Sequence, residues 1–252
     1  FIVSKVKETL IAVNARGEHL RMWHHLSWYG ATYIGLLVVA LVMRLWGLDT
    51  QAVHHDESLH AVYSWYLYDG RGYVHDPMMH GPFQFISTAG IYSLFFDSNM
   101  TTRLLPALFG TLLVAVPYLL RTQLGRYGTL ATSMLITFSP TLLYYSRFAR
   151  NDIYMAVWTL ALIAFIWRYL TTRQVRYLLL SAVVLSLAFA TKETTYIVTG
   201  MLSLFTILMI IPRTWASIVN TVETRGVSPP IAIGRLLSAA WSASRKEIDL
   251  SK

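Results

Sequence analysis

The feature that most restricts the fold of this sequence is a series of long, predominantly apolar runs. Each run approaches the roughly 20 residues that a helix needs to cross the hydrocarbon core of a bilayer. Charged residues make up only 13% of the chain, about half the share that is usual in soluble domains. The sequence therefore predicts an all-α, polytopic membrane protein with about six transmembrane helices, at residues 28–46, 101–120, 127–145, 153–170, 176–191 and 194–211.

The charged residues are unevenly divided between the two sides of these runs. Lys and Arg precede the first run, lie between the second and third and between the fourth and fifth, and follow the sixth. The loop at 47–100 instead carries Asp49, Asp56, Glu57, Asp69, Asp76 and Asp97 against Arg71 alone. Cytoplasmic loops are enriched in Lys and Arg, so we expect a multi-pass protein of the cell inner membrane with cytoplasmic termini and an external loop. The net charge of +8 does not indicate a nucleic-acid partner, because a DNA-binding patch would not alternate with membrane spans.

Both flanks of the membrane region have amphipathic patterns. Residues 1–13 place apolar residues at helical spacing with lysines off that face, which is typical of a helix lying in the membrane interface. Residues 231–246 can form a second helix of this kind. The predicted organisation is a cytoplasmic interfacial helix at 1–27, a transmembrane region at 28–211 and a cytoplasmic amphipathic tail at 212–252.

The external loop is longer than the few residues of a simple connection. Residues 56–68 and 80–96 each have an apolar face, and Asp69-Gly70 and Pro82 mark helix boundaries. Both segments are too short to be spans. We therefore expect two helices that lie on the outer membrane surface.

The first candidate site is the acidic pair Asp56-Glu57, which follows His54 and His55. A carboxylate at a membrane interface is well placed to act as a general base, because burial or a like charge would raise its pKa toward the working range. Asp56 is equally a good N-cap for the loop helix, with Glu57 in the first turn. From spacing alone we favour the N-cap.

The second candidate site is the junction between the third and fourth runs, with Arg147, Arg150 and Asp152. Arginine is disfavoured on the external side of the membrane, and its planar guanidinium can donate two parallel hydrogen bonds to a phosphate or a carboxylate. The alternative is that Arg150 pairs with Asp152 while Arg147 extends toward the interface; we favour the functional interpretation. The turn at Lys192-Glu193 is better explained as a self-neutralising surface pair.

The third candidate site is the stretch at 75–82, where two prolines fix the backbone beside His75 and His80. A rigid site loop and a simple turn into a surface helix explain this stretch equally well. Histidine is the commonest metal ligand, so a divalent metal has candidate ligands in His54, His55, His75 and His80. Their spacing matches no metal motif, and no metal is indicated.

Taken together, these segments resemble a known family of membrane enzymes. The resemblance rests on the Arg44 to Leu48 stretch, on Asp56-Glu57 followed by His60-Ala61, on the 75–82 stretch, on Ser139-Pro140 followed by residues 146–152, and on Thr191-Lys192-Glu193. In this order, over residues 36–200, they are similar to the N-terminal half of the GT-C glycosyltransferases. The nearest branches are protein O-mannosyltransferases, aminoarabinose transferases and flippase-activity-associated glycosylation proteins. Asp76 and Met78-Met79 depart from the family's His-Pro-Pro-type motif.

The resemblance implies transfer of a sugar from a polyprenyl-phosphate-linked donor to an acceptor at the external membrane face. In the family, the Asp that corresponds to Asp56 is the base that deprotonates the acceptor, and Glu57 would tune it or bind the acceptor. The resemblance assigns the donor phosphate to Arg147, Arg150 and Lys192. It also places Asp152, His75 and His80 among the substrate-binding residues. A single base implies inversion of the anomeric centre.

Two other functions remain open at this point. Family members commonly have eleven or more spans, so this chain is a fragment, a partly ordered protein or a shortened inactive paralogue. A catalytically inactive GT-C-like subunit of a larger membrane complex would use the aromatic loop as a contact surface. A gene product that ends near residue 252 would favour that subunit, and a longer one the enzyme. A lipid-linked sugar flippase accessory is disfavoured, because transporters place charges at mid-membrane and Arg44, Lys192 and Glu193 lie near span ends.

Overall fold

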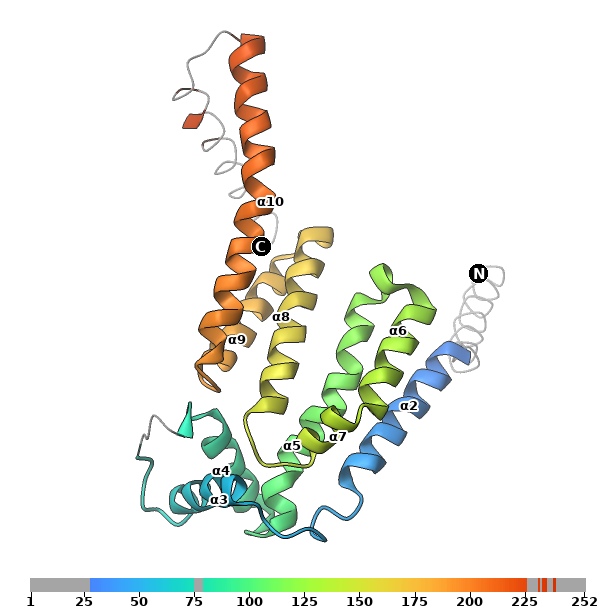
Figure 1. Ribbon diagram of the computed structural model, residues 1–252, viewed down its shortest axis with the longest axis vertical. Coiled ribbons are helices and arrows are strands. Elements are labelled where there is room, and N and C mark those ends of the chain that lie inside the picture. Colours follow the sequence, from blue (N-terminus) through green and yellow to red (C-terminus); the bar gives the residue numbers. More distant parts are fainter. Residues whose placement is uncertain (1–27, 75–78, 226–230, 232, 235–237, 239–252) are drawn as a thin grey trace, which may run out of the picture.

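The computed structural model describes residues 28–74, 79–225, 231, 233, 234 and 238. Across these residues the secondary structure is helical, which confirms the all-α prediction. The elements are, in chain order, α2 (Trp28–Leu45), α3 (His55–Tyr68), α4 (Phe83–Phe95), α5 (Asn99–Ala115), the 3-10 turn η2 (Val116–Leu120), α6 (Arg121–Phe138), α7 (Pro140–Ser146), α8 (Asp152–Thr172), α9 (Val175–Phe189) and α10 (Thr194–Arg225). Figure 1 shows them as a bundle with α3 and α4 at one end.

Three helical runs in the described part of the chain are long and apolar enough to cross a membrane: Trp28–Leu45, Asn99–Phe138 and Asp152–Thr172. The middle run contains α5, η2 and α6. It reverses direction because Gly125 has a φ of 69° inside α6, a conformation that glycine adopts without steric cost. Figure 1 shows α5 and α6 side by side, so this run makes two passes. The helix α9 and the segment Thr194–Leu208 are shorter apolar helices.

The third predicted span, 127–145, is wrong in its boundary. The structure ends α6 at Phe138 and starts the separate helix α7 at Pro140. A proline disfavours helical backbone in the residue before it, and Ser139 has an extended conformation with φ −62° and ψ 118°. The Ser139 hydroxyl then accepts a hydrogen bond from the Leu142 N–H and caps α7.

The helix that contains the sixth predicted span continues beyond it, because α10 runs through Pro212 to Arg225. The expected boundary relied on the rule that proline removes a helical hydrogen bond and kinks or breaks a helix. Helices of membrane proteins tolerate proline where neighbouring groups satisfy the freed carbonyl. The predicted interfacial helix at 1–27 lies outside the described residues, as do most of the residues in 231–246.

The loop at 47–100 forms both predicted helices. Residues 56–68 correspond to α3 and residues 80–96 to α4, with bounds shifted by no more than three residues. The two helices pack on each other, and α4 also contacts α5. Phe83, at the start of α4, packs edge-on against Phe109 of α5 and Tyr154 of α8, with ring centroids 5.9 and 5.4 Å away. This aromatic contact fixes the loop helices to the end of the bundle.

Candidate active site

The start of α3 is capped by a residue that the sequence did not indicate. The N-cap is His54, whose Nδ1 accepts a hydrogen bond from the backbone N–H of Asp56 at 3.2 Å. Glu57 completes the capping box by accepting from the backbone N–H of His54. The N-cap interpretation of Asp56 is therefore wrong. Asp56 lies in the first turn, and its side chain is available for other contacts.

Glu57 is buried in an ion pair with Arg103 of α5. Arg103 Nη2 lies 2.6 Å from Glu57 Oε2, and Nε lies 2.8 Å from Oε1. The remaining N–H groups of Arg103 donate to the carbonyl oxygens of Leu48, Gln51 and Ala52, so all five guanidinium donors have acceptors. The pair ties the end of the first span to the start of α3 and to α5.

The same carboxylate also holds the segment that carries Arg150. Glu57 Oε1 accepts a hydrogen bond from the backbone N–H of Ala149 at 2.9 Å. Burial by itself would raise the pKa of Glu57, but hydrogen bonds from Arg103, Ala149 and His54 outweigh it, and the pKa is lowered. A saturated, ionised carboxylate neither binds an acceptor nor takes up a proton readily. Glu57 is thus a positioning residue for Asp56 and Arg150.

A chain of ion pairs joins three of the predicted segments. Arg150 Nη1 lies 2.9 Å from Asp56 Oδ2, and its Nε lies 3.7 Å from Asp152 Oδ2. Lys192 Nζ lies 2.8 Å from Asp152 Oδ1. These side chains are between 17% and 38% exposed, so solvent or a ligand can reach them. We refer to Asp56, Arg150, Asp152 and Lys192 as the charged cluster.

The loop before α4 brings His80 to the same place. His80 Nδ1 lies 2.7 Å from Glu193 Oε2, so Lys192 and Glu193 pair with other residues and not with each other as predicted. The backbone N–H of Gly81 donates to the Thr191 carbonyl at 3.2 Å. A Cβ on Gly81 would lie 2.1 Å from the Ala190 carbonyl oxygen, so only glycine permits this approach. His75 lies outside the described residues.

His60 lies one turn after Asp56 on α3 and is 5% exposed. Burial lowers the pKa of His60 to about 4. The positive charges of His80 and Arg150 also lower this pKa, whereas the negative charges of Asp56 and Asp152 raise it. His60 is therefore neutral at neutral pH. These electrostatic contacts place His60, His80 and the charged cluster in one neighbourhood, although the sequence indicated separate sites.

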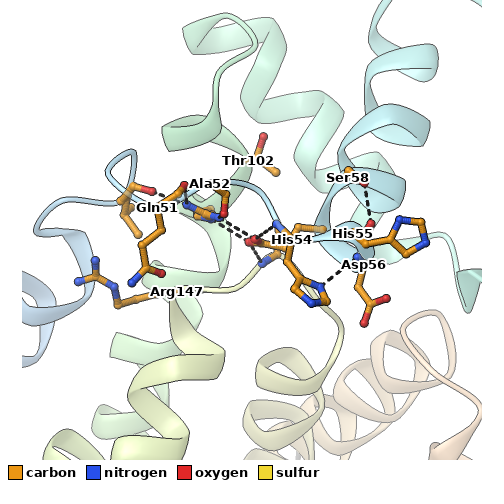
Figure 2. Close-up of polar contacts among 12 residues, drawn as sticks. Gln51, Ala52, His54, His55, Asp56, Ser58, Thr102 and Arg147 are labelled. Atoms are coloured by element: carbon orange, nitrogen blue, oxygen red, sulfur yellow. Dashed lines mark hydrogen bonds and ion pairs between the residues drawn. The ribbon is translucent and has the colours of Figure 1, made fainter.

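Arg147 does not join the charged cluster. Its Nη1 and Nη2 donate to the carbonyl oxygens of Met43 and Gly47, at the end of α2. Figure 2 shows the side chains of Arg147 and Asp56 pointing in opposite directions on either side of His54. The structure therefore does not bring Arg147 together with Arg150 and Lys192, and the role of Arg147 at a phosphate stays a prediction.

Arg103 is the main residue of this region that the sequence analysis missed. It lies within an apolar run and was counted as part of a span. An arginine near the end of a span is itself a signal, because a buried arginine needs a carboxylate or several carbonyl partners. Among the described residues, no group of three or more His, Cys, Asp or Glu side chains is arranged to hold a metal ion.

Comparison with known proteins places this geometry in a family. A family model described as dolichyl-phosphate-mannose-protein mannosyltransferase matches residues 50–227. The matched range covers well over half of the 252 residues, and it includes the whole charged cluster. No curated protein matches the chain.

Proposed function

Because the chain belongs to the dolichyl-phosphate-mannose-protein mannosyltransferase family, we propose that it transfers a sugar at the external membrane face with Asp56 as the base. The family has the GT-C fold, and its members use a polyprenyl-phosphate-linked sugar as donor. The observation that carries the proposal is the charged cluster. It brings two carboxylates and two cations together from residues 56, 150, 152 and 192.

The cluster supplies the groups that a direct displacement requires. Asp56 accepts the proton of the acceptor hydroxyl while that oxygen forms a bond to the anomeric carbon of the sugar. The bond between the anomeric carbon and the phosphate oxygen breaks, and its electron pair stays on the phosphate. The released polyprenyl phosphate therefore gains one negative charge, which Arg150 and Lys192 stabilise. One displacement inverts the anomeric centre.

The donor phosphate has to compete with carboxylates that already hold these cations. Ion pairs with this degree of exposure are worth only about 0–1 kcal/mol, so a phosphate can displace Asp56 or Asp152 at small cost. Displacement at Arg150 also releases the Asp56 carboxylate to receive the acceptor proton. Donor binding and freeing of the base are coupled in this proposal because Arg150 contacts Asp56 directly.

The donor-binding role is tested by replacing Arg150 with glutamine. We expect the Arg150→Gln substitution to raise KM for the lipid-linked sugar roughly tenfold, since a hydrogen bond to a charged group is worth about 1.5–3 kcal/mol. Arg150→Lys should raise KM less than Arg150→Gln does, because lysine keeps the positive charge but lacks the planar guanidinium that donates two parallel hydrogen bonds. Arg71→Gln is a matched control, because Arg71 is exposed and pairs with Asp69. An unchanged KM in Arg150→Gln would remove Arg150 from the donor site.

The external location is also a proposal, and Figure 1 supports it. The turn between α5 and α6, the turn between α8 and α9 and the end of α10 lie at one end of the bundle, opposite α3 and α4. Arg121, Arg126, Arg173 and Arg176 lie in or beside the first two of these turns, and Lys and Arg are enriched in cytoplasmic loops. At the other end, Arg71, Arg150 and Lys192 pair with carboxylates. We therefore place the charged cluster outside and both chain termini in the cytoplasm.

Single cysteines can test this orientation, because the chain contains none. Asp97 and Gln174 are exposed. Asp97 lies between α4 and α5, and Gln174 lies in the turn between α8 and α9 at the opposite end of the bundle. In spheroplasts, a membrane-impermeant maleimide should label the Asp97→Cys variant, and it should label the Gln174→Cys variant only after the membrane is opened. The reverse pattern would place the charged cluster in the cytoplasm.

A further inference from the structure

A pocket of about 340 Å³ lies between α3, the end of α4 and the start of α5. Figure 1 shows these segments at one end of the bundle. Trp65 of α3 lines the pocket and follows Asp56 by nine residues. Nine residues make about two and a half turns of helix, so the two side chains point to opposite sides of α3. The pocket is therefore separate from the charged cluster.

The pocket carries one negative charge that no cation balances. Asp97 is exposed and lines the pocket, and among the residues that the structure describes it forms no ion pair. The arginines that flank this region already have partners. Arg71 pairs with Asp69, and Arg103 pairs with Glu57. Asp97 thus keeps its charge available for a ligand.

The hydroxyl groups of the pocket offer acceptors and not donors. A hydroxyl has one proton to donate, and Thr102 donates its proton to the Ser98 carbonyl at 2.8 Å. Tyr92 is therefore the donor in its 2.6 Å contact with Thr102. In the same way, Thr101 donates to the Ser98 carbonyl at 3.0 Å, so the Ser98 hydroxyl donates to Thr101 Oγ1 at 2.9 Å. Only lone pairs of these hydroxyl oxygens remain for a ligand.

The apolar side of the pocket includes an indole ring. Trp65 lies there with Ala61 and Val62, and the Arg71 guanidinium is 4.7 Å from the centroid of the Trp65 ring. The ring therefore already accepts a cation, as the negative face of an aromatic ring does. A carboxylate, several lone pairs and an indole together favour a ligand with a positive charge and several N–H donors. A primary ammonium group has three such donors.

The turn that carries Asp97 is strained. Phe96 ends α4 with φ 64° and ψ 166°, a conformation that is essentially restricted to glycine. Its side chain is 77% exposed, so burial of the ring within the protein does not offset the strain. Asp97 and Ser98 follow directly and lie in the pocket. Backbone strain of this kind is typical of ligand-binding segments.

We propose that this pocket binds a protonated primary amine with a short alkyl chain. The ammonium group contacts the Asp97 carboxylate and the hydroxyl lone pairs, and the alkyl chain lies against Val62 and Trp65. The amine belongs either to a free polyamine or to a lysine side chain of a polypeptide. The site does not depend on sugar transfer, so it stands or falls independently of the proposed reaction.

The test is saturation-transfer NMR on the purified full-length protein, in a neutral detergent and an amine-free buffer at pH 7. We expect butylammonium to bind at least about tenfold more tightly than 1-butanol and butyrate, since a hydrogen bond to a charged group is the stronger kind. Equal binding of 1-butanol would overturn the ammonium assignment. Spermidine and Nα-acetyl-lysine amide identify the source. Tighter binding of spermidine would indicate a free polyamine, and tighter binding of the lysine derivative a polypeptide.

Variants assign the binding to the pocket. Asp97→Asn should weaken butylammonium binding at least about tenfold, and it should fold normally because Ser98 and Thr101 form the capping box of α5. Asp49→Asn is the matched control, because Asp49 is exposed and does not line the pocket. Val62→Trp fills the pocket but keeps Asp97, and it should block binding. Undiminished binding in Asp97→Asn or in Val62→Trp, or an equal loss in Asp49→Asn, would overturn the proposed site.

Discussion

Replacing Asp56 with asparagine should lower the rate of sugar transfer by at least about 100-fold, the low end for a positioned general base. Folding should survive, because His54 and not Asp56 caps α3. The substitution removes an ion pair with Arg150 in which both side chains are more than a third exposed. Pairs of this kind contribute about 0–1 kcal/mol. The expected result is therefore a folded protein that has lost its chemistry.

The assay measures product mass with a lipid-linked sugar and an acceptor, in membranes that contain equal amounts of each variant. Asp69→Asn is the matched control, because Asp69 lies in the same loop and pairs only with exposed Arg71 in the described contacts. The control should keep the wild-type rate. If Asp56→Asn retains most of its activity while the wild type is active, Asp56 is not the base, and the inactive-subunit hypothesis gains support.

The helices of this protein could be predicted largely from sequence, because burial in lipid leaves a simple signal. Every predicted span overlaps at least one described helix, and the loop helices α3 and α4 begin within three residues of their predicted positions. The errors are at prolines. Pro140 separates two helices within a predicted span, whereas Pro212 lies inside α10. The local sequence gives proline's preference, but neighbouring groups decide whether the helix continues.

The candidate site was predictable in its residue types but not in its contacts. Arg150 was selected because arginine is disfavoured on the external side, Asp56 because it is a carboxylate at a membrane interface, and Lys192 only through the family resemblance. Asp56 and Arg150, which pair in the structure, are 94 residues apart in the sequence, and Asp152 and Lys192 are 40 residues apart. Spacing rules act over a few residues and contain no information on such pairs. The same limit explains why Arg147 was grouped with Arg150, although the chain directs them to different contacts.

The capping residue was mispredicted for a different reason. Statistics for N-caps favour Asp strongly, and His54 satisfies the same geometry through an imidazole nitrogen. What makes His54 the cap is the contact that Glu57 makes with Arg103 and Ala149, which sets where the helix starts. The tertiary contact therefore overrides the local preference, and it frees Asp56 for the charged cluster.

The pair of Glu57 and Arg103 should accordingly be the most sensitive point for stability. Glu57→Gln keeps the shape of the side chain but leaves Arg103, which is 3% exposed, without a counter-charge. Removing one partner of a buried ion pair costs about 3–5 kcal/mol. The measurement is chemical unfolding in detergent micelles. The control is Arg71→Leu, which breaks an exposed pair and should change stability by no more than about 1 kcal/mol.

A double variant and a pH series separate this pair from a general packing defect. Glu57→Gln combined with Arg103→Leu should be less destabilised than the sum of the single variants, because no unpaired charge stays buried. The pKa of Glu57 is lower in the folded protein than in the unfolded chain, so its stabilising contribution is complete above the unfolded value of about 4.3. As the pH falls through the folded pKa this contribution is lost, and the difference in unfolding free energy between wild type and Glu57→Gln should shrink. Suppose instead that this difference stays constant as the pH falls, and that the effects of the two single variants add in the double variant. Glu57 would then stabilise the fold through its shape and not through its charge.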